Sequence, residues 1–587
     1  MDAVRKYFHA ALLGALLLGM GGAQASPAFP VKYGANSRYL VDQNNVPFPI
    51  LGRTAWFITS LSVADYRTFI DDSAARGYTA IEFHVINHDP RGNHPPFNGN
   101  GDLPFLNRLD GSAWSGALTY GNITTEAPNF TKPNPAYWSL VDGVLAYAES
   151  KGILVFMFPA YVGYAGGEQG WMQELVANGP TKAQSYGAWL ATRYKNQKNL
   201  VWMMGGDMGT GSHPFNTAQT SVENALLTGL KSVAGQQSVF FSAEWDSQSI
   251  ATDQVTFGSS MTLNGAYSWT GDVNYQGRRA YAHSTVSPAF LLEEPYDECG
   301  PDGNNYNPSA IQPVRRFQWW GWLSTIGGYI CGNGYVWPFN GSVWLGHLDS
   351  QGTRDMTRLN NFMGSIAWYN LVPSGLNGMR TLVTAGGSSV SASDYVSAAA
   401  APDGTLVVAY IPPAHNGPIT VDMAALSGTA RARWFDPTSA AYTDIGTGLA
   451  NTGTRVFTIP GNNSVGQQDW VLVLDRATGS AAPTISDIPN QSTTTNTPTA
   501  AIPFTIGDTD TAVGSLTLSG ASSNPTLVPP GNIVFGGSGA NRTVTVSPAN
   551  NQTGSATLTV SVSDGTNSAS DTFVVTVNAG ASIAAVR

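Results

Sequence analysis

Short apolar runs alternate with amphipathic helical segments along the first two thirds of the chain. Eight of these runs have the length and composition of buried strands, and helical spacing recurs between most of them. They lie at 50–57, 78–85, 153–158, 200–204, 238–242, 260–267, 289–292 and 328–331. This pattern predicts an α/β fold, a (β/α)₈ TIM barrel over residues 31–372. An open doubly wound sheet is the alternative, disfavoured because no Gly-rich phosphate loop follows the first strand.

Two helix starts support this assignment. Ser62-Val-Ala-Asp65 matches a capping box, and apolar residues then recur at helical spacing until Gly77. Asn134-Pro135 predicts a second start, with Asn as the cap and Pro at the first helical position.

After residue 372 the pattern changes to short strands and turns. Pro402-Asp-Gly404 beside an alternating run is a hairpin signal, so residues 373–476 are predicted to form a β-sandwich. Small residues at 477–483 predict a linker. Residues 484–578 are rich in Thr, Ser and Val with strict alternation, which is typical of an immunoglobulin- or cadherin-like β-sandwich.

The first 25 residues have the three parts of a secretory signal peptide. Arg5 and Lys6 precede the apolar run 10–20, and Ala23-Gln-Ala25 follows as a cleavage site. The run is too short to cross a bilayer. We therefore expect a mature protein that is secreted, periplasmic or on the cell surface, without membrane insertion.

The composition narrows the range of partners. The net charge is −10 and charged residues make up only 12%, which argues against nucleic acid and anionic membranes as partners. Sixteen Trp suit a protein that stacks sugars on aromatic rings, although most of them are expected to pack in cores. The sequence indicates no cofactor and leaves the oligomeric state open.

Carboxylates close two of the predicted strands. Asp207 ends Asn199-Leu-Val-Trp-Met-Met-Gly-Gly-Asp, after the fourth strand, and Glu293-Glu294 end the seventh. Barrel enzymes carry their chemistry at the carboxyl ends of strands, and glycosidases use two carboxyl groups. Asp207 could instead cap a helix. Alternation directs only one of Glu293 and Glu294 into the barrel, and the other could pair with Arg315 or Arg316.

Several further residues are candidates for binding a sugar. His84 follows Glu82 on the second strand, where both could face the barrel interior or His84 could be a core histidine. Tyr267 and Trp269 follow the sixth strand and Trp337 follows the eighth, and core packing is the alternative for each. The segment 87–133 is longer than an ordinary loop and is predicted to form a wall of the substrate site.

The sequence also contains candidate residues for metal sites and for a disulfide. His88, Asp89 and His94 could form a metal cluster, but their spacing matches no standard site, so no metal is expected. Asp508, Asp510 and Asp564 could bind Ca²⁺ in the last domain, and turn residues are the commoner explanation. Cys299 and Cys331 follow neighbouring strands of an exported protein, which predicts a disulfide.

Several motifs resemble the apiosidase-like glycoside hydrolases over roughly residues 31–372. They are the segment 33–42, Leu51-Gly-x-Thr-Ala-Trp56, Arg76-Gly-Tyr78, Asn134-Pro-Ala-Tyr137, 199–207 and the Glu294-Pro element. The following segment, with Trp434-Phe-Asp-Pro437, is similar to the collagen-binding-type β-sandwich often attached to that barrel.

The resemblance implies a retaining hydrolase with Asp207 as the acid/base and Glu294 as the nucleophile, and with Trp56 among the substrate-binding residues. Arg53 stands where the family usually has Asp. If Arg53 faces the sugar, it could change specificity, toward an acidic sugar, and would put apiose in doubt as the substrate.

The sequence therefore predicts a secreted glycoside hydrolase that cleaves O-glycosidic bonds in a poly- or oligosaccharide. The alternative is a non-catalytic secreted carbohydrate-binding or adhesion protein that keeps the barrel as a scaffold. Both acids at strand ends favour the enzyme, because a scaffold has no need of the pair.

Overall fold

The computed structural model describes residues 26–88, 96–116, 127–167, 169–269, 272–299, 314–476, 482–508, 511, 513–514, 516–565 and 567–580. The predicted signal peptide, most of the predicted linker, Asp89, His94 and Asp510 lie outside these ranges. The chain divides into two compact units, residues 1–476 and 477–587. Within the described part, no helix is both long and apolar enough to span a bilayer.

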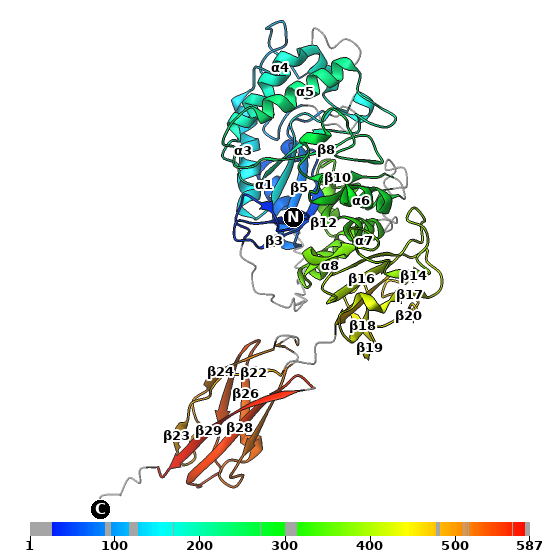
Figure 1. Cartoon of the computed structure of the whole chain (residues 1–587). Coiled ribbons are helices and arrows are strands. Elements are labelled where there is room, and N and C mark those ends of the chain that lie inside the picture. Colours follow the sequence, from blue (N-terminus) through cyan, green and yellow to red (C-terminus); the bar gives the residue numbers. More distant parts are fainter. Residues whose placement is uncertain are drawn as a thin grey trace, which may run out of the picture. The chain divides into compact units, whose positions relative to one another are not determined.

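The eight predicted strands form the barrel of the first unit (Figure 1). They are β4 (Ile50–Thr54), β5 (Ala80–His84), β6 (Leu154–Phe158), β7 (Leu200–Gly205), β8 (Phe240–Glu244), β10 (Asn264–Tyr267), β11 (Ala289–Glu293) and β12 (Ile326–Cys331). The strand order is β8-β7-β6-β5-β4-β12-β11-β10, and all these neighbours are parallel. The short strand β9 (Ser249–Ile250) pairs antiparallel with β10. The amides of Thr262 and Leu263 donate to the Phe241 carbonyl, which joins β8 to the approach of β10. The predicted barrel is confirmed.

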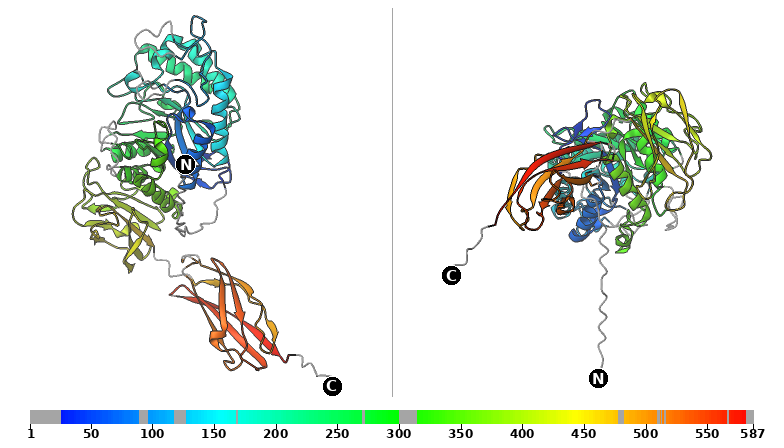
Figure 2. Two further views of the ribbon diagram at one scale, coloured as in Figure 1. Left: turned by 180° about the vertical axis from the view of Figure 1, so that it is seen from behind. Right: turned by 90° about the horizontal axis from the view of Figure 1, so that it is seen from below.

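Helices surround the strands, as the views from two further directions also make plain (Figure 2). They are α1 (Val63–Ala75), α3 (Pro135–Ser150), α4 (Met172–Arg193), α5 (Thr217–Lys231), α6 (Val273–Ala282), α7 (Val314–Thr325) and α8 (Gln351–Gly364). Ser62 caps α1 by accepting a hydrogen bond from the Asp65 amide, and Asn134 caps α3 with Pro135 in its first turn, as the sequence predicts.

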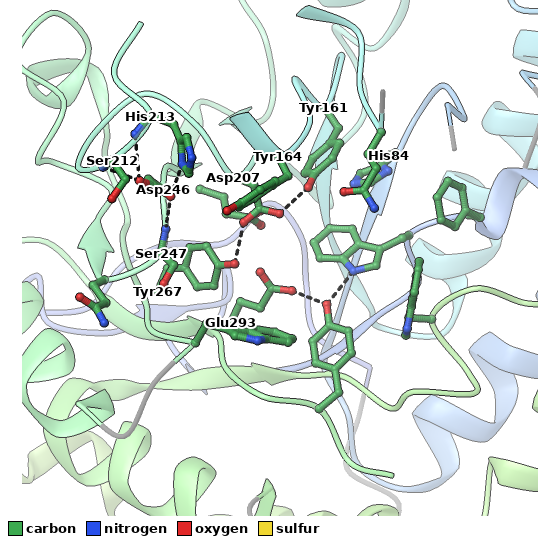
Figure 3. Close-up of a pocket in the computed structure, with 18 residues that line it drawn as sticks. His84, Tyr161, Tyr164, Asp207, Ser212, His213, Asp246, Ser247, Tyr267 and Glu293 are labelled. Atoms are coloured by element: carbon green, nitrogen blue, oxygen red, sulfur yellow. Dashed lines mark hydrogen bonds and ion pairs between the residues drawn. The ribbon is translucent and has the colours of Figure 1, made fainter. Parts of the chain in front are cut away.

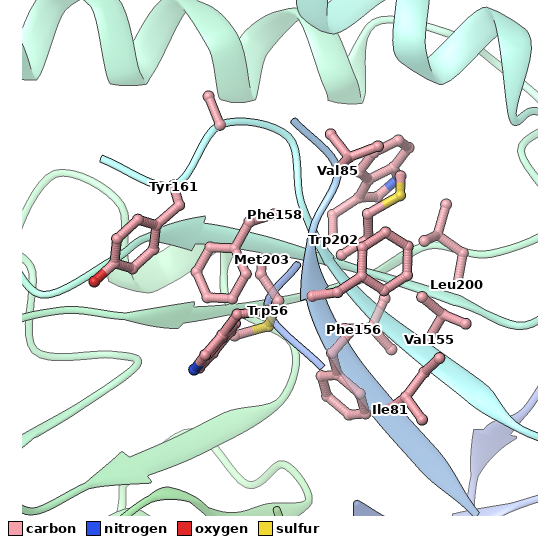
Figure 4. Packing of buried hydrophobic residues seen from close by; sticks show 14 of the residues in the cluster. Trp56, Ile81, Val85, Val155, Phe156, Phe158, Tyr161, Leu200, Trp202 and Met203 are labelled. Carbon is pink, nitrogen blue, oxygen red and sulfur yellow. The ribbon is translucent and has the colours of Figure 1, made fainter. Parts of the chain in front are cut away.

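The barrel interior is filled by side chains, so the barrel is a packed core with a site only at its end. Phe156 of β6 and Phe290 of β11 meet across the interior with ring centroids 5.3 Å apart. Figure 4 shows how Trp56, Phe158 and Met203 continue this packing. A small sheet of β1 (Lys32–Tyr33), β2 (Leu40–Val41) and β3 (Pro47–Phe48) precedes the barrel.

Two largely antiparallel sheets follow the barrel in the same unit. One has the order β13 (Val372–Pro373), β15 (Ser397–Ala400), β16 (Leu406–Ile411), β21 (Trp470–Arg476), β18 (Ala430–Phe435) and β19 (Tyr442–Leu449). The other contains β14 (Val383–Ala385), β17 (Ile419–Asp422) and β20 (Thr454–Phe457).

A buried ion pair ties these sheets to the barrel. Arg315 of α7 contacts Asp469, beside β21, and Asp355 of α8, each at 2.6 Å, with all three side chains buried. The expectation that Arg315 pairs with Glu293 or Glu294 is therefore wrong. Its charge is compensated by the neighbouring sheet and α8 instead.

The second unit consists of two four-stranded sheets around one apolar core. The first contains β22 (Thr484–Ile485), β24 (Ile502–Gly507), β27 (Asn541–Val546) and β26 (Ile533–Ser538). The second contains β23 (Gln491–Thr494), β29 (Ser568–Asn578), β28 (Gly554–Ser563) and β25 (Thr517–Ser522). Inward residues such as Val560 and Val575 are fully buried, as the alternation predicts.

Candidate active site

A cavity of about 660 Å³ opens at the carboxyl ends of the barrel strands. Residues that follow nearly every strand line it, and the close-up in Figure 3 shows several of them converging on Asp207 and Glu293. The lining includes six of the residues predicted from the sequence, namely Trp56, His84, Asp207, Tyr267, Trp269 and Trp337. Glu294 and Arg53 are absent from it.

Asp207 follows β7 through a turn that requires glycine. Gly205 and Gly206 have positive φ values of 78° and 124°, and a Cβ atom on Gly206 would lie 2.2 Å from the Tyr161 ring. Asp207 itself has φ +54°, a conformation that few non-glycine residues adopt and that is common at functional sites. The two glycines therefore let the chain pass close to the Tyr161 ring and turn, so that the Asp207 carboxylate lines the pocket.

Two tyrosine hydroxyls hold the Asp207 carboxylate. Tyr161 donates to Oδ2 at 2.6 Å, and Tyr267 donates to Oδ1 at 2.6 Å. Burial raises the pKa of Asp207, and both hydroxyls act in the opposite direction because they stabilise the anion.

Glu293 ends β11 and lies in the pocket near Asp207. The Tyr296 hydroxyl donates to its Oε1, and the Trp56 indole donates in turn to that hydroxyl at 2.7 Å. Burial and the Asp207 charge raise the pKa of Glu293 to about 8. Glu293 is therefore oriented by a chain of two donors that begins just after β4, the first strand of the barrel.

Glu294 lies outside the pocket, so the expectation that it faces Asp207 is wrong. The interior positions of β11 are Phe290 and Leu292, whereas Leu291 packs against Gly321 of α7. Strict alternation would then direct Glu294 inward. A bulge breaks the alternation, because Ala266 pairs with Leu291 while the next residue of β10 pairs with Glu293.

Glu244, at the end of β8, is a third carboxyl group in the pocket. One oxygen from each of Asp207, Glu244 and Glu293 lies within 4.8 Å of one from each of the other two. Burial and the charges of its neighbours raise the pKa of Glu244 well above the ordinary value. Three carboxyl groups this close cannot all be ionised without large repulsion, so the cluster retains protons and titrates as a unit.

This trio is also the group of described residues whose spacing could hold a metal ion. A Ca²⁺ ion requires six to eight oxygen ligands, and both oxygens of Asp207 already accept hydrogen bonds from tyrosines. Acids with tyrosine donors are better suited to proton transfer and nucleophilic attack.

One wall of the pocket is aromatic. The His84 ring stacks on both Trp56 and Tyr161, with centroid distances of 4.7 and 4.1 Å, and the Trp56 and Tyr161 centroids are 6.3 Å apart. At the opposite side, Asp246 accepts hydrogen bonds from the Ser212 and His213 amides and pairs with the His213 ring at 3.1 Å. Flat aromatic faces beside a polar wall are what a sugar ring requires.

Arg53 points away from the pocket, so it cannot face a sugar there. It pairs with Asp72 of α1 at 2.7 Å and lies over the rings of Phe69 and Tyr78. The argument from Arg53 for an acidic sugar, and against apiose, therefore does not hold.

Cys299 and Cys331 are both buried and no disulfide joins them in the structure, so the predicted disulfide is not formed. The Cys331 thiol contacts the Gly52 carbonyl and the Tyr78 hydroxyl, on the side of β12 away from the pocket. Burial raises the pKa of Cys331 to about 12. Of the three residues weighed as a metal cluster and not expected to form one, the described member His88 pairs with Glu174 at 3.0 Å.

A barrel with carboxyl groups converging at the ends of its strands defines the fold and site of a glycoside hydrolase. Residues 34–370 match the family model "Apiosidase-like, catalytic domain", and 382–475 match the "Putative collagen-binding domain of a collagenase". The chain belongs to the apiosidase-like family and is a glycoside hydrolase.

Solved structures support the fold. One titled "Glycoside hydrolase" has a TM-score of 0.59 and 19% identity, over 77% of this chain and 99% of its own. A glycoside hydrolase family 5 protein from Bacteroides vulgatus ATCC 8482 has the same TM-score and identity, over 76% and 94%. No curated protein sequence matches the chain.

The sequence analysis missed several residues of the site. Glu244 ends an apolar run, so the same strand-end rule that selects Asp207 could have selected it. Tyr161, Tyr296 and His213 lie in loops after strands, where the sequence pattern carries no comparable signal.

Proposed function

We propose that this protein is an exported enzyme that hydrolyses O-glycosidic bonds in a poly- or oligosaccharide with retention of configuration. The spacing of Asp207 and Glu293 carries the proposal, since oxygens of the two lie within 4.8 Å. Retaining enzymes need carboxyl groups about 5–5.5 Å apart, whereas inverting enzymes leave about 6.5–9.5 Å for a water molecule.

Glu293 is the nucleophile and Asp207 is the acid/base. Glu293 is only 5% exposed and deep in the pocket, while Asp207 is partly exposed. The acid/base must reach both the leaving oxygen and the incoming water, which favours the more exposed group. Glu293 replaces Glu294 in this role because Glu294 does not line the pocket.

The reaction has two displacements. Glu293 attacks the anomeric carbon while Asp207 gives its proton to the leaving oxygen, which produces a glycosyl ester and an alcohol. Asp207 then removes a proton from water, whose oxygen attacks the same carbon and releases Glu293 as the carboxylate. Tyr161 and Tyr267 orient Asp207, and Tyr296 orients Glu293.

The proposal is tested by incubating the full chain with a panel of plant and bacterial polysaccharides and recording the anomer of the first product by NMR. A product that keeps the anomeric configuration supports the proposal. An inverted first product contradicts the mechanism, and the absence of any product across the panel favours the alternative, a non-catalytic carbohydrate-binding protein.

Export is tested separately. The signal-like segment before Ser26 supports cleavage after Ala25. Protein recovered outside the cytoplasm should begin at Ser26, and an intact Met1 terminus on that protein would contradict export by this segment.

A further inference from the structure

Glu244 lines the pocket but has no role in the two-displacement reaction. It is 1% exposed, the Asp207 backbone amide stabilises its carboxylate, and within the described part of the chain no side chain donates a hydrogen bond to either carboxyl oxygen. Burying a carboxyl group beside no more than a backbone amide costs free energy, which hydrogen bonds from a ligand would offset. Glu244 therefore has the chemistry of a ligand-binding group.

The charge of the pocket restricts that ligand. The lining contains the four acids Asp207, Glu244, Asp246 and Glu293, and none of the described lining residues is a Lys or Arg. His213 is paired with Asp246, and the His84 ring stacks on Trp56 and Tyr161. A sugar carboxylate is normally bound by Arg or Lys, so here it would add a further negative charge beside the acids with no such cation to compensate it.

We propose that Glu244 is a glycone-recognition residue, which binds hydroxyl groups of an uncharged sugar in the pocket and makes the enzyme selective for neutral over uronic-acid glycans. This inference rests on the proposed function and specifies its substrate class. The hydroxyls of the bound sugar form hydrogen bonds with the Glu244 carboxyl group, next to Glu293, so the same residue anchors the ring that Glu293 attacks.

The test uses the full chain carrying Glu293→Gln, which removes the nucleophile while keeping the side-chain shape. Its binding is measured on two sets of oligosaccharides, one built only from neutral sugars (mannan, xylan, galactan and arabinan fragments) and one built only from uronic acids. Glu244→Ala and Glu244→Gln are then added separately to this protein. Glu82→Gln is the matched control, because Glu82 is equally buried and, among the described residues, also receives no side-chain hydrogen bond, but lies outside the pocket.

We expect binding to at least one neutral oligosaccharide and none to the uronic acids. Glu244→Ala should weaken neutral binding at least about tenfold, the amount expected for loss of hydrogen bonds to a buried group. Glu244→Gln should retain part of that affinity because the amide keeps one acceptor, and Glu82→Gln should stay within about twofold.

Two outcomes would overturn the inference while leaving the proposed function intact. They are binding of uronic-acid oligosaccharides, or an unchanged neutral affinity in both Glu244 variants. If no oligosaccharide binds and the wild-type chain also yields no product from the polysaccharide panel, the proposed function itself is contradicted.

Discussion

The Tyr161 hydroxyl donates a 2.6 Å hydrogen bond to Oδ2 of Asp207. Tyr161 lies in the loop after β6 and Asp207 in the loop after β7, so the bond joins neighbouring loops. The Tyr267 hydroxyl, at the end of β10, donates a hydrogen bond to Oδ1 of the same carboxylate. Because both donors stabilise the carboxylate, they lower the pKa of Asp207, against the effect of burial.

Tyr161→Phe should therefore raise the pKa of Asp207. If Asp207 acts as the acid, the loss of kcat/KM at alkaline pH should move to higher pH, and kcat should fall about tenfold as the carboxyl group loses its orientation. Tyr296→Phe removes a donor from Glu293 instead, so the acidic limb should move to higher pH. Identical pH profiles for both variants would contradict the separate roles.

Glu223 of α5 supports the strand end that carries Asp207, since its carboxylate accepts a 2.9 Å hydrogen bond from the Gly205 amide. Burial raises the pKa of Glu223 from 4.5 to about 7. A carboxyl group whose pKa is raised by folding binds more protons in the folded state, so its contribution to stability falls as the pH rises from about 4.5 to 7.

Replacing Glu223 by Gln removes the contribution of this carboxyl group to the pH dependence of stability. Relative to the wild type, Glu223→Gln should gain up to about 3 kcal/mol in free energy of unfolding between pH 4.5 and pH 8. Denaturant unfolding of both proteins at the two pH values measures the difference. A constant difference across this range would show that Glu223 is not protonated on folding.

The ion pairs of Arg315 should be important for stability but not for catalysis. Arg315→Ala leaves Asp469 buried without its cation and Asp355 with only the partly exposed Arg358, which should cost about 3–5 kcal/mol in urea unfolding. Arg358→Ala is the control, because Arg358 also pairs with Asp355 but is partly exposed, so its loss should cost about 1 kcal/mol or less. Equal losses in both variants would contradict this account.

The cysteines should be reduced in the native protein. Thiol labelling without reductant should detect neither Cys299 nor Cys331 in the folded chain, because both are buried. After unfolding, still without reductant, the same reagent should label both. Failure to label either one after unfolding would indicate that they are bridged.

Much of the fold could be predicted because the hydrophobic pattern, the helix caps and the turn residues all indicate the same elements. The eight strands, the caps at Ser62 and Asn134 and the change to alternating strands after the barrel all depend on local patterns. Six of the eight predicted site residues also line the pocket, since a residue at a strand end is directed there by the barrel itself.

The errors at the site arise where the structure departs from regular strand geometry or depends on distant contacts. The bulge in β11 reverses the directions of Glu293 and Glu294, and alternation alone cannot reveal it. Arg53 turns to Asp72 and two aromatic rings on α1 and before β5, a tertiary arrangement that its position in the sequence does not encode.

The most direct measurement of the central claim compares Glu293→Ala with Glu294→Ala on a substrate that the wild type hydrolyses, with and without azide. We expect Glu293→Ala to lose at least about 10⁴-fold in kcat, and azide to restore part of the turnover as a glycosyl azide of inverted configuration, because azide takes the place of the nucleophile. Glu294→Ala, if it remains folded by circular dichroism, should keep activity within about tenfold and gain nothing from azide. Loss and azide rescue in Glu294→Ala, with an active Glu293→Ala, would contradict the assignment.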